Sequence, residues 1–268
     1  MHERVSVNAC CFPGENLETI FGHWRELAPA RVSLVSNVVL GDEFAATQAR
    51  FAASPYRIET IIHPFLLGAT LEDKPALAAA RDKLSEAISA AAKLGARSVY
   101  FFTGSRGSLT WEQAAETVSS AIRPCVAQAK EAGVQLLMET AGPLYADIHI
   151  AHSLRDTITL AEMADVGINI DIFTCWAEAG LKQNIERAIP RCGLVQVSDY
   201  VLGDRASPCR AVPGDGAIPL KRIMDWILDA GYQGAFDLEL IGPRIDAEGR
   251  VAACQRAADW VTHYLEAR

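Results

Sequence analysis

Residues 134–139 read VQLLME, an apolar run of strand length that ends on a carboxylate. Three later runs repeat the pattern: VGINID at residues 166–171, LVQ at residues 194–196 and AFDLE at residues 235–239. In a parallel β/α barrel all strands end at the same rim, so residues at successive carboxyl ends converge although they are far apart in sequence. The recurrence predicts that four side chains meet at one rim: Glu139, Asp171, Gln196 and Glu239.

The rest of the chain fits such a barrel. Its 268 residues match the roughly 250 residues of an eightfold barrel, which predicts a single domain over residues 1–268. Strand-like and helix-like runs alternate throughout, as is typical of α/β proteins with a parallel sheet. We therefore predict a (β/α)8 TIM barrel, with strands at residues 5–8, 31–36, 58–63, 97–102, 134–139, 167–171, 194–198 and 235–240.

The segments between these strands carry helix signals. Residues 77–94 have apolar side chains at three- and four-residue spacing, which predicts a helix on the outside of the barrel. Pro75 stands where its first turn would begin, and Gly95 follows its last apolar residue. Pro124 interrupts the helix that starts near Thr110, so we expect that helix to kink or to begin anew there.

Composition excludes several classes of protein. The net charge of −8 opposes a nucleic-acid partner, because binding to nucleic acid depends largely on Lys and Arg that neutralise phosphates. No apolar stretch approaches the roughly 20 residues of a membrane helix, so we expect no span. The first residues lack the features of a secretory signal, which predicts a cytoplasmic protein. Seven cysteines without CxxC spacing indicate neither a zinc site nor a disulfide framework.

Three carboxylates and one amide oxygen suit a hard divalent cation such as Mg²⁺ or Mn²⁺ better than zinc. A charge at the end of a buried run is costly unless it is paired or binds a metal, so the alternative for Glu139, Asp171 and Glu239 is a salt bridge at the rim. The alternative for Gln196 is a hydrogen-bonded core amide.

Other candidate residues lie near the same rim. His63 ends the third predicted strand and could polarise a substrate oxygen or move a proton, although a structural hydrogen bond explains it equally well. Arg210 and Arg244 could bind a carboxylate or hydroxyl of a substrate, or form ion pairs at the rim. Trp176 could form an apolar wall of the pocket. Two long loops, at residues 140–152 and 200–218, are expected to cover the site.

With these residues the chain resembles the xylose-isomerase-like barrel superfamily of sugar isomerases and epimerases, most specifically from Glu139 onward. Its relatives include hydroxypyruvate isomerase, inosose dehydratase, 3-dehydroshikimate dehydratase and endonuclease IV. In simpler members one metal is held by Glu, Asp, His and Glu on the last four strands, and the resemblance gives these roles to Glu139, Asp171, Gln196 and Glu239. Further family elements look like Arg210, Gly214-Asp215-Gly216 and the segment from Gly231 to Gly234.

The chain departs from the family pattern at two positions. The seventh-strand motif His-x-x-Asp begins here with Gln196, which still offers an oxygen ligand and leaves Mg²⁺ or Mn²⁺ favoured. The sixth-strand motif Asp-x-x-His ends here with Thr174, at the position of a substrate-binding histidine. A similar Glu, Asp, Gln, Glu set occurs in some 3-dehydroshikimate dehydratases.

The expected chemistry is proton abstraction next to a carbonyl, with Glu139 and Glu239 as the acid/base pair. This predicts a metal-dependent isomerase or epimerase of a small polyhydroxy carbonyl compound. A dehydratase of the dehydroshikimate or inosose type is the alternative, since loss of a hydroxyl beta to the same carbanion gives dehydration. An endonuclease needs more histidines at the rim than the chain offers, and a non-enzymatic binding barrel would hold no metal. The sequence leaves the substrate and the formation of a homo-oligomer open.

Overall fold

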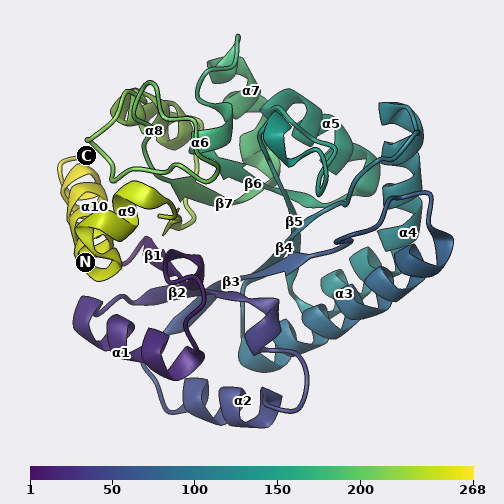
Figure 1. The fold of residues 1–268 in the computed structure, drawn as a ribbon, viewed down its shortest axis with the longest axis horizontal. Helices are drawn as coiled ribbons and strands as arrows, with labels where there is room; N and C mark the ends of the chain where they lie inside the picture. The colour runs from purple at the N-terminus through teal and green to yellow at the C-terminus, as the bar shows by residue number, and fades with distance from the viewer.

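The computed structural model describes residues 1–268 as a closed barrel of eight parallel strands in sequence order (Figure 1). The barrel closes where β8 pairs with β1. The strands are β1 (Val5–Asn8), β2 (Arg31–Val35), β3 (Arg57–Pro64), β4 (Ser98–Phe102), β5 (Gln135–Glu139), β6 (Gly167–Asp171), β7 (Cys192–Val197) and β8 (Phe236–Leu238). The predicted (β/α)8 TIM barrel is confirmed, and each strand lies within two residues of its predicted bounds.

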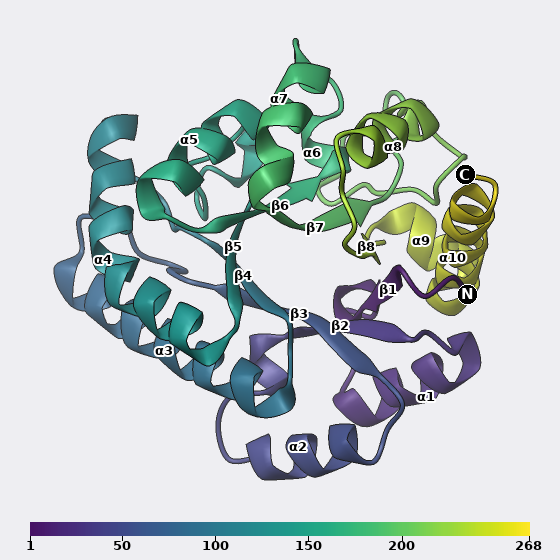
Figure 2. The same cartoon turned by 180° about the vertical axis from the view of Figure 1, so that it is seen from behind.

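A ring of helices surrounds the strands, as both cartoon views show (Figure 2). The helices are α1 (Leu17–Leu27), α2 (Phe44–Ala52), α3 (Lys74–Leu94), α4 (Trp111–Ala132), α5 (Leu154–Ala164), α6 (Ile172–Cys175), α7 (Leu181–Ala188), α8 (Leu220–Asp229), α9 (Pro243–Glu248) and α10 (Arg250–Glu266). Short 3₁₀ segments are η1 (Ala9–Cys11), η2 (Ser36–Val38), η3 (Pro143–Tyr145) and η4 (Ile189–Arg191).

Local capping residues explain where the long helices start and stop. Asp73 caps α3, because its carboxylate accepts a hydrogen bond from the Ala76 N–H at 3.0 Å, and Gly95 ends the helix in the left-handed region at φ 68°. Thr110 and Gln113 form a capping box at the start of α4. That helix does not begin anew at Pro124, because buried residues on both sides of the proline keep it packed as far as Ala132.

The apolar core has two parts. The larger part fills the space between strands and helices and contains 69 buried residues. The smaller part lies inside the barrel and consists of Ile62, Tyr100, Leu137, Leu194 and Ala235. Three of these stand two residues before a polar residue on the same face of their strand, since side chains alternate along a strand. The apolar layer therefore supports the polar residues at the carboxyl end.

The amino end of the barrel holds a separate ion cluster. Glu59 of β3 is buried and accepts hydrogen bonds from Arg31 Nη1 at 2.7 Å and from Arg97 Nη1 at 3.1 Å.

Both termini of the chain lie beside α10, where the His2 N–H donates to Thr262 Oγ1 at 3.0 Å (Figure 1).

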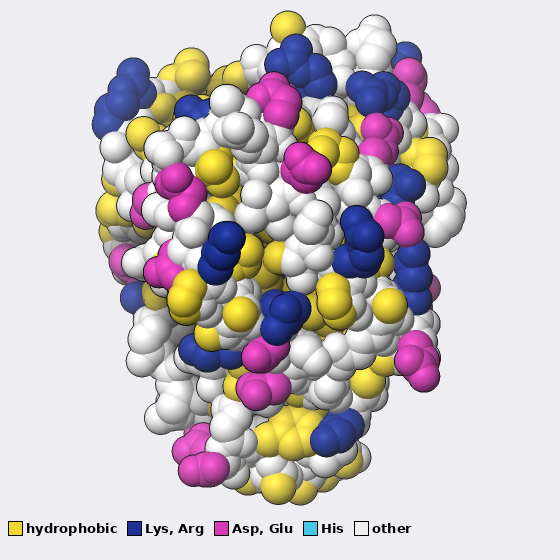
Figure 3. Space-filling model, turned by 90° about the vertical axis from the view of Figure 1, so that its right-hand side faces the viewer, with side chains coloured by type: hydrophobic (Ala, Val, Ile, Leu, Met, Phe, Trp, Pro, Cys, Tyr) yellow, Lys and Arg dark blue, Asp and Glu magenta, His cyan; other side chains and the backbone are white.

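The face drawn in Figure 3 mixes basic and acidic side chains, with apolar ones in small groups between them. No patch of a single charge dominates this face. None of the helices is both long and apolar enough to cross a membrane.

Candidate active site

The structure brings together the four residues that were predicted to converge. Glu139 and Asp171 end β5 and β6, Gln196 is the penultimate residue of β7, and Glu239 directly follows β8. Asp171 and Gln196 are partners in the β6–β7 register, and Gln196 Nε2 donates to Glu239 Oε2 in a close contact. Glu139, Asp171 and Gln196 are at most 3% exposed, and the side chain of Glu239 is 12% exposed. We refer to Glu139, Asp171, Gln196 and Glu239 as the rim cluster.

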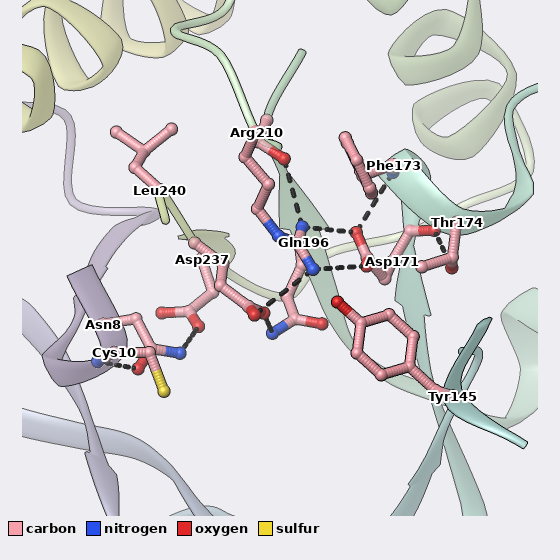
Figure 4. Close-up of polar contacts among 12 residues, drawn as sticks. Asn8, Cys10, Tyr145, Asp171, Phe173, Thr174, Gln196, Arg210, Asp237 and Leu240 are labelled. Carbon is pink, nitrogen blue, oxygen red and sulfur yellow. Dashed lines mark hydrogen bonds and ion pairs between the residues drawn. The ribbon is translucent and has the colours of Figure 1, made fainter. Parts of the chain in front are cut away.

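Arg210 is the positively charged side chain that contacts the rim cluster (Figure 4). Its Nη1 and Nη2 donate to the two oxygens of Asp171 at 3.1 and 2.8 Å, and Nη2 lies 3.2 Å from Glu239 Oε1. The guanidinium also lies over the ring of Phe173, 4.7 Å from its centroid. Sequence analysis left open a substrate anchor or an ion pair at the rim for Arg210, and the structure shows it in ion pairs with two of the acidic residues.

A single carboxylate folds the loop that carries Arg210. Asp199 is buried, and its two oxygens accept the backbone N–H groups of Tyr200, Gly214, Gly216 and Ile218 at 2.8–3.0 Å. Asp199 and Ala211 also exchange two backbone hydrogen bonds of 2.8 Å, which fixes the residue next to Arg210. A Cβ on Gly216 would lie 2.3 Å from Asp199 Oδ1, so this position requires glycine.

The rim cluster carries more negative than positive charge. Three carboxylates face one guanidinium, and Glu139 Oε2 is buried without a hydrogen-bond partner. Burial, together with the charges of Glu239 and Asp171, raises the pKa of Glu139 well above its ordinary value. Burial also raises the pKa of Glu239, against the opposing effect of Arg210. Burial alone would lower the pKa of Arg210, but Asp171 and Glu239 outweigh it and raise that pKa.

The rim cluster fits a hard divalent cation in charge and in the type of its oxygen donors. The partnerless oxygen of Glu139 is the clearest sign, since buried polar atoms are normally satisfied. In the present side-chain arrangement, no three of the His, Cys, Asp and Glu side chains are placed to hold one metal ion. Arg210 is instead the cation between Asp171 and Glu239.

Sequence analysis missed a second polar group inside the barrel. Asp237 is fully buried, and its oxygens accept hydrogen bonds from Asn8 Nδ2 and Ser33 Oγ, both at 2.7 Å. Burial raises the pKa of Asp237 to about 7, although these hydrogen bonds oppose the shift. The alternation along β8 could have revealed it, because Asp237 stands two residues before Glu239 and faces the same side.

His63 is not brought to the rim cluster. It lies between the barrel and α3, where its Nδ1 is 3.0 Å from Ser36 Oγ and its Nε2 has no partner. Its side chain lines a cavity of about 570 Å³ together with Ser36 and Lys83. Burial and the charge of Lys83 lower the pKa of His63 to about 4. The cause is strand parity, because Ile62 faces the barrel interior and His63 therefore faces outward.

Of the other predicted substrate contacts, Thr174 and Trp176 closely follow the end of β6, whereas Arg244 lies in α9. The hydroxyl of Thr174 lies 2.8 Å from the carbonyl oxygen of Thr140 and 2.9 Å from that of Asp171, so it is engaged with the backbone. Trp176 packs against Tyr200 at a centroid distance of 6.3 Å. Arg244 is exposed and pairs with Asp204 at 2.7 Å, so it is not brought into the rim cluster.

His149 supports the rim cluster from behind, a role that sequence analysis did not assign. It is buried, its Nδ1 accepts from the Thr103 N–H at 3.1 Å, and its Nε2 therefore donates to the Glu139 carbonyl at 2.8 Å. Burial lowers its pKa to about 4, against the effect of the Glu139 carbonyl. His149 thus fixes the backbone at the end of β5.

Comparison with known proteins identifies the family. Residues 17–263 match the family described as xylose isomerase-like TIM barrel, and the chain belongs to it, as the resemblance predicted. No curated protein sequence matches the chain.

Several solved structures share the fold. A protein from Sinorhizobium meliloti is 22% identical with a TM-score of 0.84, over 96% of this chain and 98% of that chain. The IolI protein with a bound zinc atom is 13% identical with a TM-score of 0.82, over 97% of each chain. An L-ribulose 3-epimerase is 17% identical with a TM-score of 0.81, over 99% of this chain and 95% of that chain. At these identities the similarity establishes the fold alone.

Proposed function

We propose that the chain is a divalent-metal-dependent isomerase or epimerase that acts on a small polyhydroxy carbonyl compound, such as a keto-sugar. The observation that carries this proposal is the buried rim cluster, in which three carboxylates and an amide have a single cation, Arg210, paired with Asp171 and Glu239. The names of two similar structures support it, since one is an L-ribulose 3-epimerase and another contains a zinc atom.

The rim cluster would hold the cation, and its oxygen donors favour Mn²⁺ or Mg²⁺. When bound, such a cation stabilises the negative charge that develops on a substrate oxygen. The amide of Gln196 takes the place of a nitrogen ligand, which removes the feature that favours zinc.

Glu139 and Glu239 are the proposed acid/base pair. They come from β5 and β8, which are separated by two strands in the barrel order, so they approach the centre of the rim from different sides. One carboxylate removes the proton next to the carbonyl, and the other returns a proton on the other side. Arg210 orients the substrate through its guanidinium donors, and Thr174 and Trp176 remain proposed as walls of the substrate site. His63 is left out, because it faces the cavity outside the barrel.

A dehydratase of the 3-dehydroshikimate or inosose type is the second candidate. Gln196 favours it, since the same Glu, Asp, Gln, Glu set is what the resemblance associates with some dehydratases. Ultraviolet absorbance distinguishes the two reactions, because dehydration creates a conjugated product and epimerisation does not.

The decisive experiment incubates Mn²⁺-loaded protein with a panel of keto-sugars and cyclic keto-acids in D₂O and follows the products by NMR. We expect deuterium at a carbon next to the carbonyl of at least one compound, with no new absorbance. Loss of the proton next to the carbonyl and of a beta hydroxyl, with appearance of a conjugated product, supports the dehydratase instead. Absence of exchange across the panel, together with absence of a saturable Mn²⁺ site by calorimetry, contradicts both.

A further inference from the structure

The side-chain amide of Gln196 turns its nitrogen, and not its oxygen, toward Glu239. Its Oε1 accepts a hydrogen bond from Asn169 Nδ2 at 2.7 Å, deep in the barrel. Its Nε2 donates to Glu239 Oε2 and to Tyr100 Oη, the latter at 3.1 Å. An amide nitrogen has donors and no free acceptor site, so in this orientation Gln196 cannot ligate a cation.

Asn169 shows that this orientation is only partly satisfied. It is fully buried, and its Oδ1 has no hydrogen-bond partner while its Nδ2 is bound to Gln196. Its neighbour in the β5–β6 register is Glu139, whose Oε2 is also buried without a partner. Two partnerless acceptors on adjacent strands leave room for a donor or a cation.

Turning both amides by half a turn about their last torsion angle preserves the bond between them with the roles reversed. Gln196 Nε2 then donates to Asn169 Oδ1, and Gln196 Oε1 faces Glu239. Asn169 Nδ2 takes the place of the partnerless Oδ1, on the strand next to Glu139, whose Oε2 is an acceptor without a partner. Tyr100 accommodates either state, because its hydroxyl accepts from an amide N–H and can equally donate to an amide oxygen. The terminal torsions of Gln and Asn are broad and roughly two-fold, so neither state strains the side chains.

We propose that Asn169 and Gln196 form an amide pair that turns as a unit and sets which atom of Gln196 faces the rim cluster. In the structure the nitrogen of Gln196 faces Glu239, and in the turned state its oxygen would be available to hold a cation. Asn169 is the positioning residue of the pair, since it acts through its hydrogen bond to Gln196. The inference rests on the proposed metal-dependent function, and it assigns to Asn169 the task of making glutamine an oxygen ligand.

The test is a double-mutant cycle in which the dissociation constant for Mn²⁺ is measured by calorimetry, without substrate. Leucine at position 169 cannot accept the hydrogen bond from Gln196 Nε2, so N169L should bind Mn²⁺ at least tenfold more weakly than the wild type. Q196E provides the matched background, because a carboxylate presents oxygen on both sides and needs no orienting partner. In that background N169L should change the dissociation constant by less than threefold.

Equal weakening by N169L in both backgrounds would mean that Asn169 acts on stability alone and would overturn the inference. A dissociation constant of N169L within twofold of the wild type would also overturn it.

If N169L does not fold, N169D provides the test. Its carboxylate only accepts hydrogen bonds, so it must hold Gln196 with its nitrogen toward position 169 and its oxygen toward the cation. N169D should bind Mn²⁺ at least as tightly as the wild type, and tenfold weaker binding contradicts the proposal. A wild type without any saturable Mn²⁺ site overturns the metal-dependent function and this inference together, whereas the other outcomes concern Asn169 alone.

Discussion

The two ends of the barrel both bury carboxylates, but they balance the charge differently. At the amino end, Glu59 alone meets two guanidinium groups, those of Arg31 and Arg97. At the carboxyl end, the three carboxylates of the rim cluster have Arg210 as their only ion-pair partner, and Glu139 keeps an oxygen without any partner. The charge of Glu59 is balanced, so this ion cluster stabilises the fold. The rim cluster keeps an excess of negative charge and an unpaired oxygen, which suits the binding of a ligand. The comparison separates structural from functional acids in one molecule.

The largest expected effect separates the two ends directly. E239Q deletes a proposed base without changing side-chain volume, so turnover should fall by about 10³-fold with the fold intact. E59Q makes the same change at the amino end and should leave turnover within about threefold, while the free energy of unfolding falls by about 1–3 kcal/mol. Steady-state kinetics and urea unfolding of both variants test the pair. Near-full activity of E239Q would remove it from the mechanism.

The next prediction concerns the two arginines that sequence analysis treated alike. R210M leaves Asp171 buried without its ion pair, so the free energy of unfolding of chelator-treated protein should fall by about 3–5 kcal/mol. R244M removes an exposed pair with Asp204 and should produce no measurable change. Thermal and urea unfolding of the two variants give the comparison. Equal effects would mean that Arg210 is no more than a surface ion pair.

The affinity for Mn²⁺ tests whether Glu139 is a metal ligand. E139A removes an oxygen from the rim cluster, so the dissociation constant for Mn²⁺ should rise by about a hundredfold or more. E72A removes an exposed carboxylate whose hydrogen bonds go to Ser108, and it should leave the dissociation constant unchanged. Calorimetry on both variants decides the matter, and unchanged binding in E139A rejects Glu139 as a ligand.

The smallest effect tests whether His63 lies outside the site. Its pKa of about 4 in the folded protein is below the ordinary value of 6.5, because it is buried and Lys83 is near. The unfolded chain therefore binds a proton between these values that the folded protein does not bind. The contribution of His63 to stability is thus present above pH 6.5 and lost as the pH falls toward 4.

Between pH 7 and pH 5 the wild type should accordingly lose about 2 kcal/mol of unfolding free energy that H63Q does not lose. Urea unfolding of both proteins at the two pH values measures the difference. Turnover of H63Q at pH 7 should stay within about threefold of the wild type. Parallel stabilities at both pH values would show that His63 is already solvated.

The sequence was sufficient for the barrel and for the convergence at its rim. The strands are strongly apolar and are separated by clear helix signals, and strand ends in a parallel barrel share one rim whatever the loops do. Glu139, Asp171, Gln196 and Glu239 could therefore be placed together without any contact being known.

The sequence could not show which way a side chain points or which residue it pairs with. His63 and Ile62 are adjacent, and only the register of β3 decides which of them faces the interior. Arg210 and Arg244 look equivalent in sequence, but the loop after β7 buries Arg210, whereas Arg244 is exposed on α9. The orientation of the Gln196 amide depends on Asn169, a partner 27 positions away.

The loop at residues 200–218 depends on a single carboxylate in its centre. Since Asp199 accepts four backbone N–H groups, these four hydrogen bonds are gained or lost together. Opening of the segment would then occur as one cooperative unit of local unfolding, with slow amide hydrogen exchange shared by Gly214, Gly216 and Ile218. Because Arg210 lies in the same unit, each opening event would also withdraw the positive charge from the carboxylates. The order of this backbone segment and the electrostatic potential at the carboxyl end of the barrel would therefore change together.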